Sequence, residues 1–484
     1  MDILSKNTLG QVPNSVAKPN YDCDAIQTSV LHFGVGNFHR AHQAAYCEKL
    51  LNLGHINAGI VGVSLRSASM RDSLIEQDFL YSLTTLNSEP HVSIMGVLQN
   101  MLVAPESPET VVENVANSNI QLVTTTITEK GYCLVNNKLD TSTQDIQLEL
   151  LSLEKPKTIY GFLAAGLIKR FQSNQSPLTI LCCDNVNQGG LKLKTGVEWL
   201  LNHHAPKVMQ WCEKSVAFIS SMVDRITPAT DESLIRQTSE ITTMKDSVPV
   251  SAEPFSQWVI ENNFAGEKLP FDSVGALFVE NIEEYETVKL RFLNASHSIF
   301  ATIGYLFGDD YIHQAVERKN LLQLTQDYLL KELIPVTHAP RGINLYDYTE
   351  QTLQRFSNEK VPYRTLQVGS DSSLKIQQRW FPSIDNVLKT KQPNTAMAFI
   401  LASWVVFIAI SLKKGTLNDP NHQHFEAVAE SESEPYIHAM LKVANANNFA
   451  FFNDNAFMSN VAAWYDIIQA QGIANSLSTY LKTQ

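Results

Sequence analysis

The pattern that most restricts the fold is an alternation of short β-type runs and helical runs through the first half of the chain. It begins with a strand at residues 29–33, a helix at 39–53 that Gly54 ends, and a second strand at 58–65. Strands that alternate with helices are typical of a mostly parallel sheet covered on both faces. We therefore expect a doubly wound α/β domain over residues 1–279. The alternation continues with runs at 120–128, 159–172, 178–183, 190–201 and 216–223.

The second half of the chain has few strand signals. Long helical patterns dominate from about residue 280, so we expect a mostly α-helical domain over residues 280–484. Its run at 395–412 contains 18 residues without a charge, which approaches the length of a membrane span. Because it is the only such run, we interpret it as a helix buried inside the helical domain. The helical runs are 283–307, 320–333, 345–356, 394–412 and 459–481.

The composition of the chain limits the classes of binding partner and the cellular compartment that we expect. The chain has 37 Lys and Arg against 49 Asp and Glu, a formal charge of −12, which argues against a nucleic-acid or anionic-membrane binder. Six scattered cysteines without a C-x-x-C pair indicate reduced thiols, and residues 1–20 contain no apolar signal-type core. We expect a cytoplasmic protein without nucleic-acid or membrane partners. The oligomeric state stays open, a monomer included.

A glycine turn follows the first strand. The strand runs into Gly34-Val35-Gly36 and then into a helix. Glycines in such a turn let the backbone approach a pyrophosphate, and the helix start offers free N–H groups. The turn predicts a Rossmann-like dinucleotide site, although His39 stands where a third glycine is usual and a turn without a ligand is the alternative. The predicted cofactor residues here are Gly34, Gly36, Asn37, Phe38, His39 and Arg40.

The end of the second strand bears on the choice of cofactor. It reads Ser64-Leu65-Arg66-Ser67, with no acid before Asp72. An acid about 20 residues after the glycines marks NAD, whereas an arginine accepts the 2′-phosphate of NADP. We expect NAD and leave NADP open, with Arg66 either a cofactor contact or an ordinary surface residue. His39 and His42 have the spacing of a metal-ligand pair, but no third ligand follows, so no metal site is predicted.

Two later strands each end in polar residues. Asp184 and Asn185 follow the run at 178–183, and Asp224 follows the run at 216–223. Ligand sites in open α/β sheets lie outside the carboxyl ends of the strands, which makes these residues candidates for the site. A turn cap or an ion pair with a nearby arginine is the structural alternative.

The helix predicted at 283–307 carries the most informative polar groups. At about 100° per residue, Glu286, Lys289, Asn294 and His297 fall within about 140° of one side, while apolar residues surround the whole helix. The polar groups are therefore expected to face a partly enclosed cleft. A desolvated lysine can act as a general base near neutral pH, and an amide can donate to a developing alkoxide. An exposed Glu286–Lys289 pair is the alternative.

Six separated motifs occur in order over most of the chain. They are Gly34-x-Gly36-x-Phe38-His39-Arg40-Ala41-His42-Gln43, Thr128-Glu129-Lys130-Gly131-Tyr132, Cys183-Asp184-Asn185, Val223-Asp224-Arg225-Ile226, Glu253-Pro254-Phe255 and Lys289-Leu290-Arg291-x-Leu293-Asn294-x-Ser296-His297-Ser298. With these motifs the chain resembles the mannitol dehydrogenase family of polyol-specific long-chain dehydrogenases. The resemblance implies metal-independent, NAD(P)-dependent interconversion of a secondary alcohol and a ketone in an open-chain polyol or sugar acid.

The same resemblance implies roles for single residues. The lysine that matches Lys289 is the general acid/base, and the glutamate that matches Glu286 moves its proton to and from solvent. Asparagines that match Asn185 and Asn294 hold the reacting oxygen. Residues that match His297 and Asp224 bind or orient the substrate.

The substrate is indicated by residues 363–379. Arg364-Thr365-x-Gln367, followed by Asp371-x-Ser373 and Lys375 to Arg379, resembles a segment of fructuronate reductases, whereas mannitol 2-dehydrogenases usually have arginine at Gln367. A carboxylate on the substrate needs a cation, which Arg364, Lys375 or Arg379 could supply unless they bind the cofactor or join the domains. Ser372 departs from the usual glycine, and the strand at 59–66 resembles the mannitol branch. We expect interconversion of D-fructuronate and D-mannonate, with a mannitol 2-dehydrogenase as the alternative. A non-catalytic dinucleotide-binding protein is the remote alternative.

Overall fold

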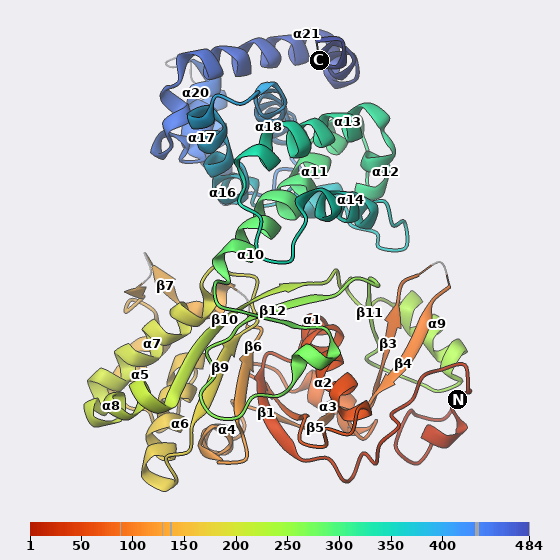
Figure 1. Cartoon of the computed structure of the whole chain (residues 1–484), viewed down its shortest axis with the longest axis vertical. Coiled ribbons are helices and arrows are strands. Elements are labelled where there is room, and N and C mark those ends of the chain that lie inside the picture. The colour runs from red at the N-terminus through yellow and green to blue at the C-terminus, as the bar shows by residue number, and fades with distance from the viewer. Residues whose placement is uncertain (88, 128, 136–137, 431–434, 484) are drawn as a thin grey trace. The chain divides into compact units, whose positions relative to one another are not determined.

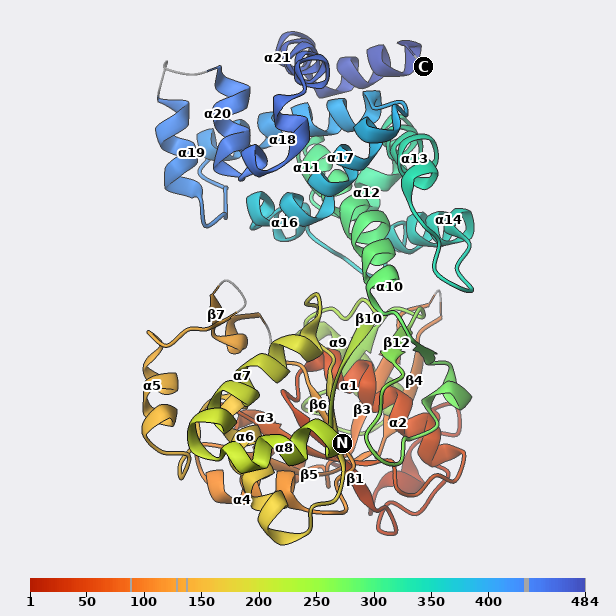
Figure 2. The same cartoon turned by 60° about the vertical axis from the view of Figure 1, so that its left-hand side comes forward.

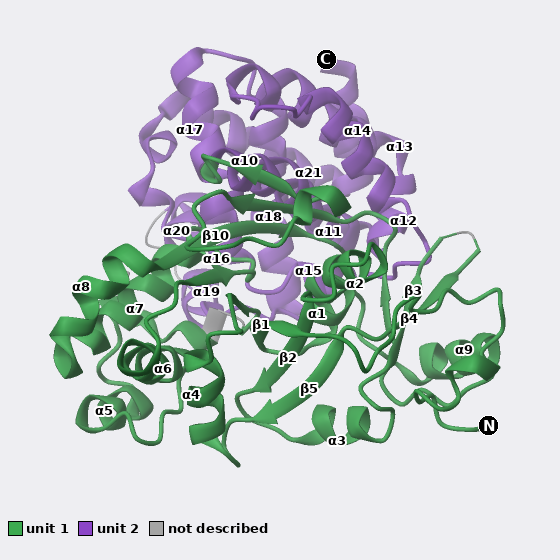
Figure 3. Ribbon diagram, turned by 60° about the horizontal axis from the view of Figure 1, so that its bottom comes forward, with its two compact units in different colours: residues 1–283 green, residues 284–484 purple. Residues whose placement is uncertain are grey.

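The computed structural model describes residues 1–483 except 88, 128, 136–137 and 431–434, and it divides into two compact units (Figure 3). The first unit, Met1–Glu283, is built around a large sheet, and the second, Glu284–Gln484, is helical in its described residues. The expected fold class, a Rossmann-like α/β sheet followed by a mostly helical domain, is confirmed.

The large sheet has eight strands in the order β13-β12-β10-β9-β6-β1-β2-β5 (Figure 1). The six from β10 to β5 are parallel, and their spatial order is that of two βαβαβ halves that meet beside β1. At one edge β12 runs antiparallel to β10 and pairs with β13, a reversal that the sequence pattern did not predict. The strands are β1 Thr28–Phe33, β2 Gly59–Ser64, β5 Leu98–Val103, β6 Leu122–Thr125, β9 Leu178–Cys182, β10 Val216–Asp224, β12 Gln257–Glu261 and β13 Leu277–Val279.

Each face of the sheet has its own apolar core because successive strand side chains point to opposite faces. In β1, Leu31 and Phe33 belong to a core with α4, α6 and α7, whereas Val30 belongs to a core with α2 on the other face. Figure 2 shows α6, α7 and α8 gathered apart from α1 and α2. The strands therefore read as nearly continuous apolar runs. These helices are α1 Asn37–Ala41, α2 Gln43–Asn52, α4 Pro108–Ala116, α6 Ile159–Ser173, α7 Gly189–His204 and α8 Pro206–Ser215.

Two details of the first unit differ from the expected pattern. The helix expected at 39–53 is broken into α1 and α2 at His42, whose φ and ψ are −118° and −86°. A second sheet of three strands, in the order β11-β3-β4, also lies in this unit. The remaining elements of the unit are β3 Tyr81–Thr85, β4 His91–Met95, β7 Leu134–Val135, β8 Lys138–Leu139, β11 Val250–Ala252, α3 Ser69–Ile75, α5 Gln144–Leu151 and α9 Glu232–Thr242.

The second unit is organised around α18, Thr395–Lys413. It is the one described helix that is long and apolar enough to cross a membrane, and 78% of its apolar window is buried inside the protein. This burial fits the interpretation of a core helix. The other α-helices are α10 Glu283–Val288, α11 Ala295–Phe307, α12 Ile312–Glu317, α13 Lys319–Asp327, α14 Leu345–Phe356, α15 Thr365–Val368, α16 Ser372–Arg379, α17 Phe381–Thr390, α19 His422–Ala429, α20 Tyr436–Val443 and α21 Asn455–Thr483, and a π-helix, η5, spans Tyr328–Leu333.

Candidate active site

The turn after β1 is pressed against the end of β6. Gly34 has a φ of +100°, and a Cβ at this position would lie 2.1 Å from the carbonyl oxygen of Thr126. The Thr126 hydroxyl donates a hydrogen bond to the Gly34 carbonyl at 2.7 Å. Both the backbone angle and the lack of space require glycine at position 34.

Gly36 is a glycine for a different reason. Its φ is −96°, which any residue adopts, and a Cβ there would meet no protein atom closer than 3.9 Å. Packing within the protein does not demand glycine here, whereas close approach of a pyrophosphate to the backbone does. The open space at the carboxyl end of β1 therefore fits a nicotinamide dinucleotide.

The polar side chains that follow Gly36 brace the turn. Asn37 Nδ2 donates to Thr230 Oγ1 at 3.0 Å. The buried Arg40 guanidinium donates to Asn37 Oδ1 at 2.8 Å and to the Val248 carbonyl. In this structure Asn37 and Arg40 thus tie the turn to residues 228–248, and their contact with a cofactor stays a prediction.

The two histidines of the turn face different neighbours. The His39 ring is fully buried and stacks on His32 with centroids 3.3 Å apart, and burial lowers the pKa of His39 well below its usual range. His42 Nε2 lies 2.9 Å from the Gln257 carbonyl oxygen, and its ring stacks on Phe38. The two imidazoles do not converge. Within the described residues no group of three or more His, Cys, Asp or Glu could hold a metal ion.

His32 is a supporting residue that the sequence analysis missed. Its ring lies inside the sheet, with Nδ1 2.7 Å from Thr124 Oγ1 and Nε2 2.9 Å from Thr126 Oγ1. Burial lowers the pKa of His32 to about 3, so the ring is neutral. It joins β1 to β6 directly below the glycine turn. A polar residue in the middle of an apolar strand was the available signal.

The carboxyl ends of β9 and β10 carry the predicted polar residues of the first unit. Buried Asp184 accepts hydrogen bonds from Tyr132 OH at 2.7 Å and from Thr125 Oγ1 at 3.1 Å, and it therefore anchors the chain just after β9. Asn185 follows with an exposed side chain, and Asp224, 5% exposed, is the last residue of β10. Because β9 and β10 run parallel to β1, Asn185 and Asp224 lie at the same edge of the sheet as the Gly34 turn. Thr128, the first residue of the motif at residues 128–132, lies outside the described residues.

In the second unit the helix expected at 283–307 is present, but its middle is a π-helix, η4 Lys289–Asn294, between α10 and α11. The uniform α-helical period was therefore wrong for these residues. In a helix with i→i+5 hydrogen bonds each residue turns by roughly 80°. The angle between the side chains of Lys289 and Asn294 shrinks from about 140° to about 40°. The wide turn places the lysine and the amide on one side of the helix.

Side chains from other helices of this unit support the π turn. A wide turn disturbs the regular carbonyl ladder of a helix, and carbonyl oxygens without a backbone donor need other partners. These contacts come from residues 37 to 85 positions further along the chain, which periodicity cannot show. They are Tyr328 OH to Arg291 O at 3.4 Å, Arg379 Nη1 to Asn294 O at 3.1 Å, and Trp380 Nε1 to Ala295 O at 3.3 Å.

The functional side chains of this helix differ in exposure. Lys289 is 8% exposed, and Glu286, Asn294 and His297 are half-buried. The His297 ring stacks on Phe356 with centroids 4.7 Å apart and meets the Tyr363 ring edge-on at 5.4 Å. These two rings fix the orientation of the imidazole. The predicted general base therefore lies in a shielded position, and the histidine on the same helix has a fixed orientation.

The three cations proposed for a substrate carboxylate have separate surroundings. Arg379 donates to Asn294 O and, at 2.6 Å, to Ser298 Oγ, and burial lowers its pKa to about 10. Lys375 Nζ donates to the Val368 carbonyl at 3.0 Å, and burial, with the charge of Arg379, lowers its pKa to about 8. Arg364 is exposed just before α15. Of these three cations, only Arg379 forms a hydrogen bond to the helix that carries Lys289, within the described residues.

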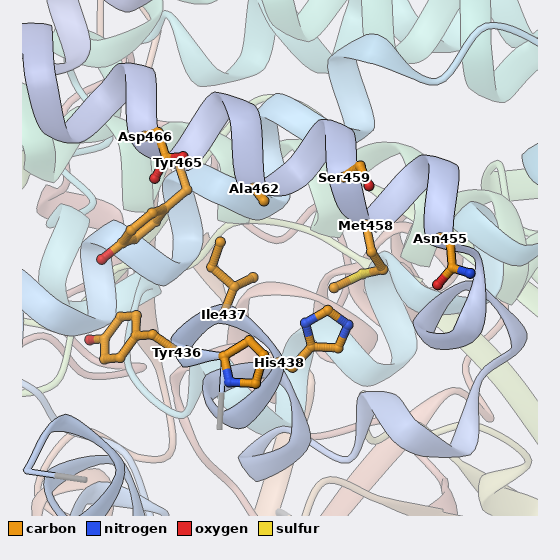
Figure 4. A pocket seen from close by; sticks show the side chains of 10 residues that line it. Tyr436, Ile437, His438, Asn455, Met458, Ser459, Ala462, Tyr465 and Asp466 are labelled. Carbon is orange, nitrogen blue, oxygen red and sulfur yellow. The ribbon is translucent and has the colours of Figure 1, made fainter. Parts of the chain in front are cut away.

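A pocket of about 370 Å³ lies elsewhere in the second unit, between α20 and α21 (Figure 4). Tyr436 and His438 on α20 face Met458 and Tyr465 on α21 across it. None of the predicted site residues lines this pocket.

Comparison with known proteins identifies the family. The model of the mannitol dehydrogenase Rossmann domain matches residues 28–273, and that of the mannitol dehydrogenase C-terminal domain matches residues 281–469. The chain belongs to the mannitol dehydrogenase family. Among family members, a polyol:NADP oxidoreductase of Gluconobacter oxydans is 32% identical over 92% of this chain and 91% of its own. A mannitol 2-dehydrogenase of Pyricularia oryzae is 31% identical over 97% of this chain and 96% of its own.

Solved structures of the mannitol dehydrogenase family share the whole fold. A substrate-free D-sorbitol dehydrogenase superposes with a TM-score of 0.89, 29% identity and coverage of 98% of this chain and 100% of its own. The mannitol 2-dehydrogenase of Pseudomonas fluorescens, a ternary complex with NAD and D-mannitol, gives a TM-score of 0.85, 29% identity and coverage of 99% and 100%. The family predicted from the motifs is confirmed. These relatives are named for polyols, so they favour the mannitol alternative over the predicted closeness to fructuronate reductases, which they do not show.

Proposed function

We propose that this protein is an NAD(P)-dependent polyol dehydrogenase that interconverts a secondary alcohol and a ketone, with the D-mannitol and D-fructose pair as its substrate class. The observation that carries the proposal is the π turn, which puts shielded Lys289 and the Asn294 amide on one side of a helix. A base and an amide donor in that arrangement suit the removal of a hydroxyl proton while negative charge grows on its oxygen.

The residues of the chain handle the proton and the charge. The nicotinamide, when bound, takes up or supplies the hydride of the carbinol carbon. In the oxidation direction the neutral Lys289 amine removes the hydroxyl proton, and half-buried Glu286 passes that proton to solvent. The resemblance to mannitol dehydrogenases gives Asn294 and Asn185 the role of donating hydrogen bonds to the oxygen while the C=O bond forms. His297 and Asp224 orient the neighbouring hydroxyls of the substrate.

A second substrate class has its own support in the sequence. Gln367 stands where mannitol 2-dehydrogenases usually have arginine, and residues 364–379 resemble the fructuronate reductase pattern. D-fructuronate and D-mannonate are therefore the second candidate pair, with Lys375 or exposed Arg364 as partner of the carboxylate. The names of the relatives, which refer to polyols, support the polyol pair more than this one.

The first experiment is an initial-rate panel with D-mannitol, D-fructose, D-mannonate and D-fructuronate, each with NAD(H) and NADP(H). We expect the highest kcat/KM with D-mannitol and D-fructose. Preference for the two sugar acids would replace the substrate class and leave the chemistry unchanged. Dinucleotide binding without turnover of any of the four would favour a non-catalytic dinucleotide-binding protein.

A variant at position 289 tests the mechanism. Lys289→Ala should abolish turnover and leave dinucleotide binding within a fewfold of the wild type, whereas Lys319→Ala, at an exposed lysine of α13, should leave both unchanged. Asn185→Ala and Asn294→Ala should each lower kcat by roughly two to three powers of ten, the cost of losing one donor to a developing oxyanion. Normal turnover by Lys289→Ala would remove the lysine from the mechanism.

A further inference from the structure

The segment that follows β2 lies where a bound dinucleotide would place its adenosine ribose. β1 and β2 pair in parallel with Phe33 opposite Val63, and Gly34 N donates to the Val63 carbonyl at 2.9 Å. Residues from Ser64 on therefore leave the sheet beside the glycine turn. In dinucleotide folds the end of this strand contacts the ribose 2′ position, where NAD has a hydroxyl and NADP a phosphate.

This segment offers a cation and no competing carboxylate. Arg66 is exposed, and within the part of the chain that the structure describes its guanidinium forms no ion pair or hydrogen bond with another residue. No Asp or Glu occurs from Ser64 to Arg71. A carboxylate would accept a hydrogen bond from the NAD hydroxyl and repel a phosphate, so its absence takes away the usual preference for NAD.

The nearest acids are already neutralised. Arg71 Nη2 lies 2.7 Å from Asp72 Oδ1, and its Nη1 and Nη2 both donate to Glu106, which follows β5 on the far side of β2. One arginine thus holds both carboxylates. Arg66, five residues earlier, keeps its guanidinium available for an anion, and a planar guanidinium binds a phosphate with two parallel hydrogen bonds.

Serine hydroxyls shape the same turn. Ser64 Oγ donates to the Ser67 carbonyl at 2.7 Å and accepts from Ser67 N at 3.2 Å, so the chain is closed around Arg66. Ser67 Oγ lies 3.0 Å from Ser69 Oγ, and both side chains are exposed. A turn ordered before ligand binding loses less entropy when the ligand binds, and its hydroxyls are further donors for phosphate oxygens.

We propose that residues 64–69 bind the 2′-phosphate of NADP(H), with Arg66 as the charged partner, and that the protein prefers NADP(H) over NAD(H). This inference rests on the proposed function for the presence of a dinucleotide site, and it concerns only which dinucleotide enters that site.

The test compares binding of 2′,5′-ADP and 5′-AMP to the full-length protein by calorimetry, together with kcat/KM for NADPH and NADH. We expect 2′,5′-ADP to bind at least tenfold more tightly than 5′-AMP. Arg66→Ala should weaken 2′,5′-ADP and NADPH by roughly 10- to 100-fold, the loss of hydrogen bonds from a charged donor, and change 5′-AMP and NADH by less than threefold. Arg66→Lys should recover part of the loss.

Arg236→Ala is the matched control, because Arg236 is an exposed arginine of α9 in the same unit and carries the same charge. It should leave the preference for 2′,5′-ADP intact. Equal binding of the two nucleotides, or equal losses in Arg66→Ala and Arg236→Ala, would overturn the inference. Binding of neither nucleotide would overturn both this inference and the proposed function. A clear preference for 2′,5′-ADP without turnover of any polyol or uronate would support the inference and overturn the proposed function alone.

Discussion

Arg379 has two candidate roles, recognition of a substrate carboxylate and support of the helix that carries Lys289. Its guanidinium donates to Asn294 O at 3.1 Å and to Ser298 Oγ at 2.6 Å. Arg379→Met keeps the apolar stem and removes both hydrogen bonds. The Asn294 carbonyl then loses the donor that holds it at the end of the π turn.

The size of the effect follows from these two contacts. A hydrogen bond from a charged donor contributes about 1.5–3 kcal/mol, and part of that is recovered when water or another group replaces the donor. We expect the free energy of unfolding to fall by about 2–4 kcal/mol. A shift of the Asn294 amide by about 1 Å would lower kcat by up to about 100-fold. In the proposed mechanism the amide acts on the reacting oxygen, so the loss should be the same for D-fructose and for D-fructuronate.

The assay measures kcat and KM for both ketones at saturating cofactor, and stability by urea unfolding. Arg379→Lys keeps one donor and should recover part of kcat, and Lys389→Met, at an exposed lysine of α17, should change nothing. A lower stability with unchanged kcat would refute the positioning role. A higher KM for D-fructuronate alone, with normal kcat, would instead make Arg379 the partner of the substrate carboxylate.

Two further predictions concern the glycine turn and a buried acid. Gly34→Ala should destabilise the first unit by more than about 3 kcal/mol because its Cβ would lie 2.1 Å from Thr126 O. Gly36→Ala should leave the free energy of unfolding in urea nearly unchanged and weaken dinucleotide binding. Equal stability of the two variants would contradict this prediction. Glu332 accepts hydrogen bonds from Ala396 N and Met397 N at the start of α18, and burial raises its pKa from 4.5 to about 8. Since the folded state then binds the proton more tightly than the unfolded state, the free energy of unfolding should fall as pH rises from 4.5 to about 8. The fall should be smaller in Glu332→Gln, and parallel pH profiles of the two proteins would disprove the assignment.

Local features of the sequence predicted much of the fold. The alternation of apolar runs and helical runs indicated the doubly wound sheet, because a strand buried on both faces must be apolar along its whole length. The glycine turn after β1 and the apolar run of α18 were also visible, since each is a local pattern of the chain. The reversed strand β12 and the break at His42 were not visible, because pairing with β10 and contact with Gln257 involve distant residues.

The candidate site was also predicted only in part from the sequence. The sequence by itself supplied the identities of Lys289, Asn294 and His297 and their place on one helix. Only the tertiary structure decided that a π turn narrows the angle between the lysine and the amide, because side chains such as Arg379 and Trp380, more than 80 residues away, bind carbonyl groups at the end of that turn. The periodicity of a sequence reflects interactions between residues that are close in the chain. The geometry of this helix also depends on residues that are distant in the chain and reach it only when the protein folds.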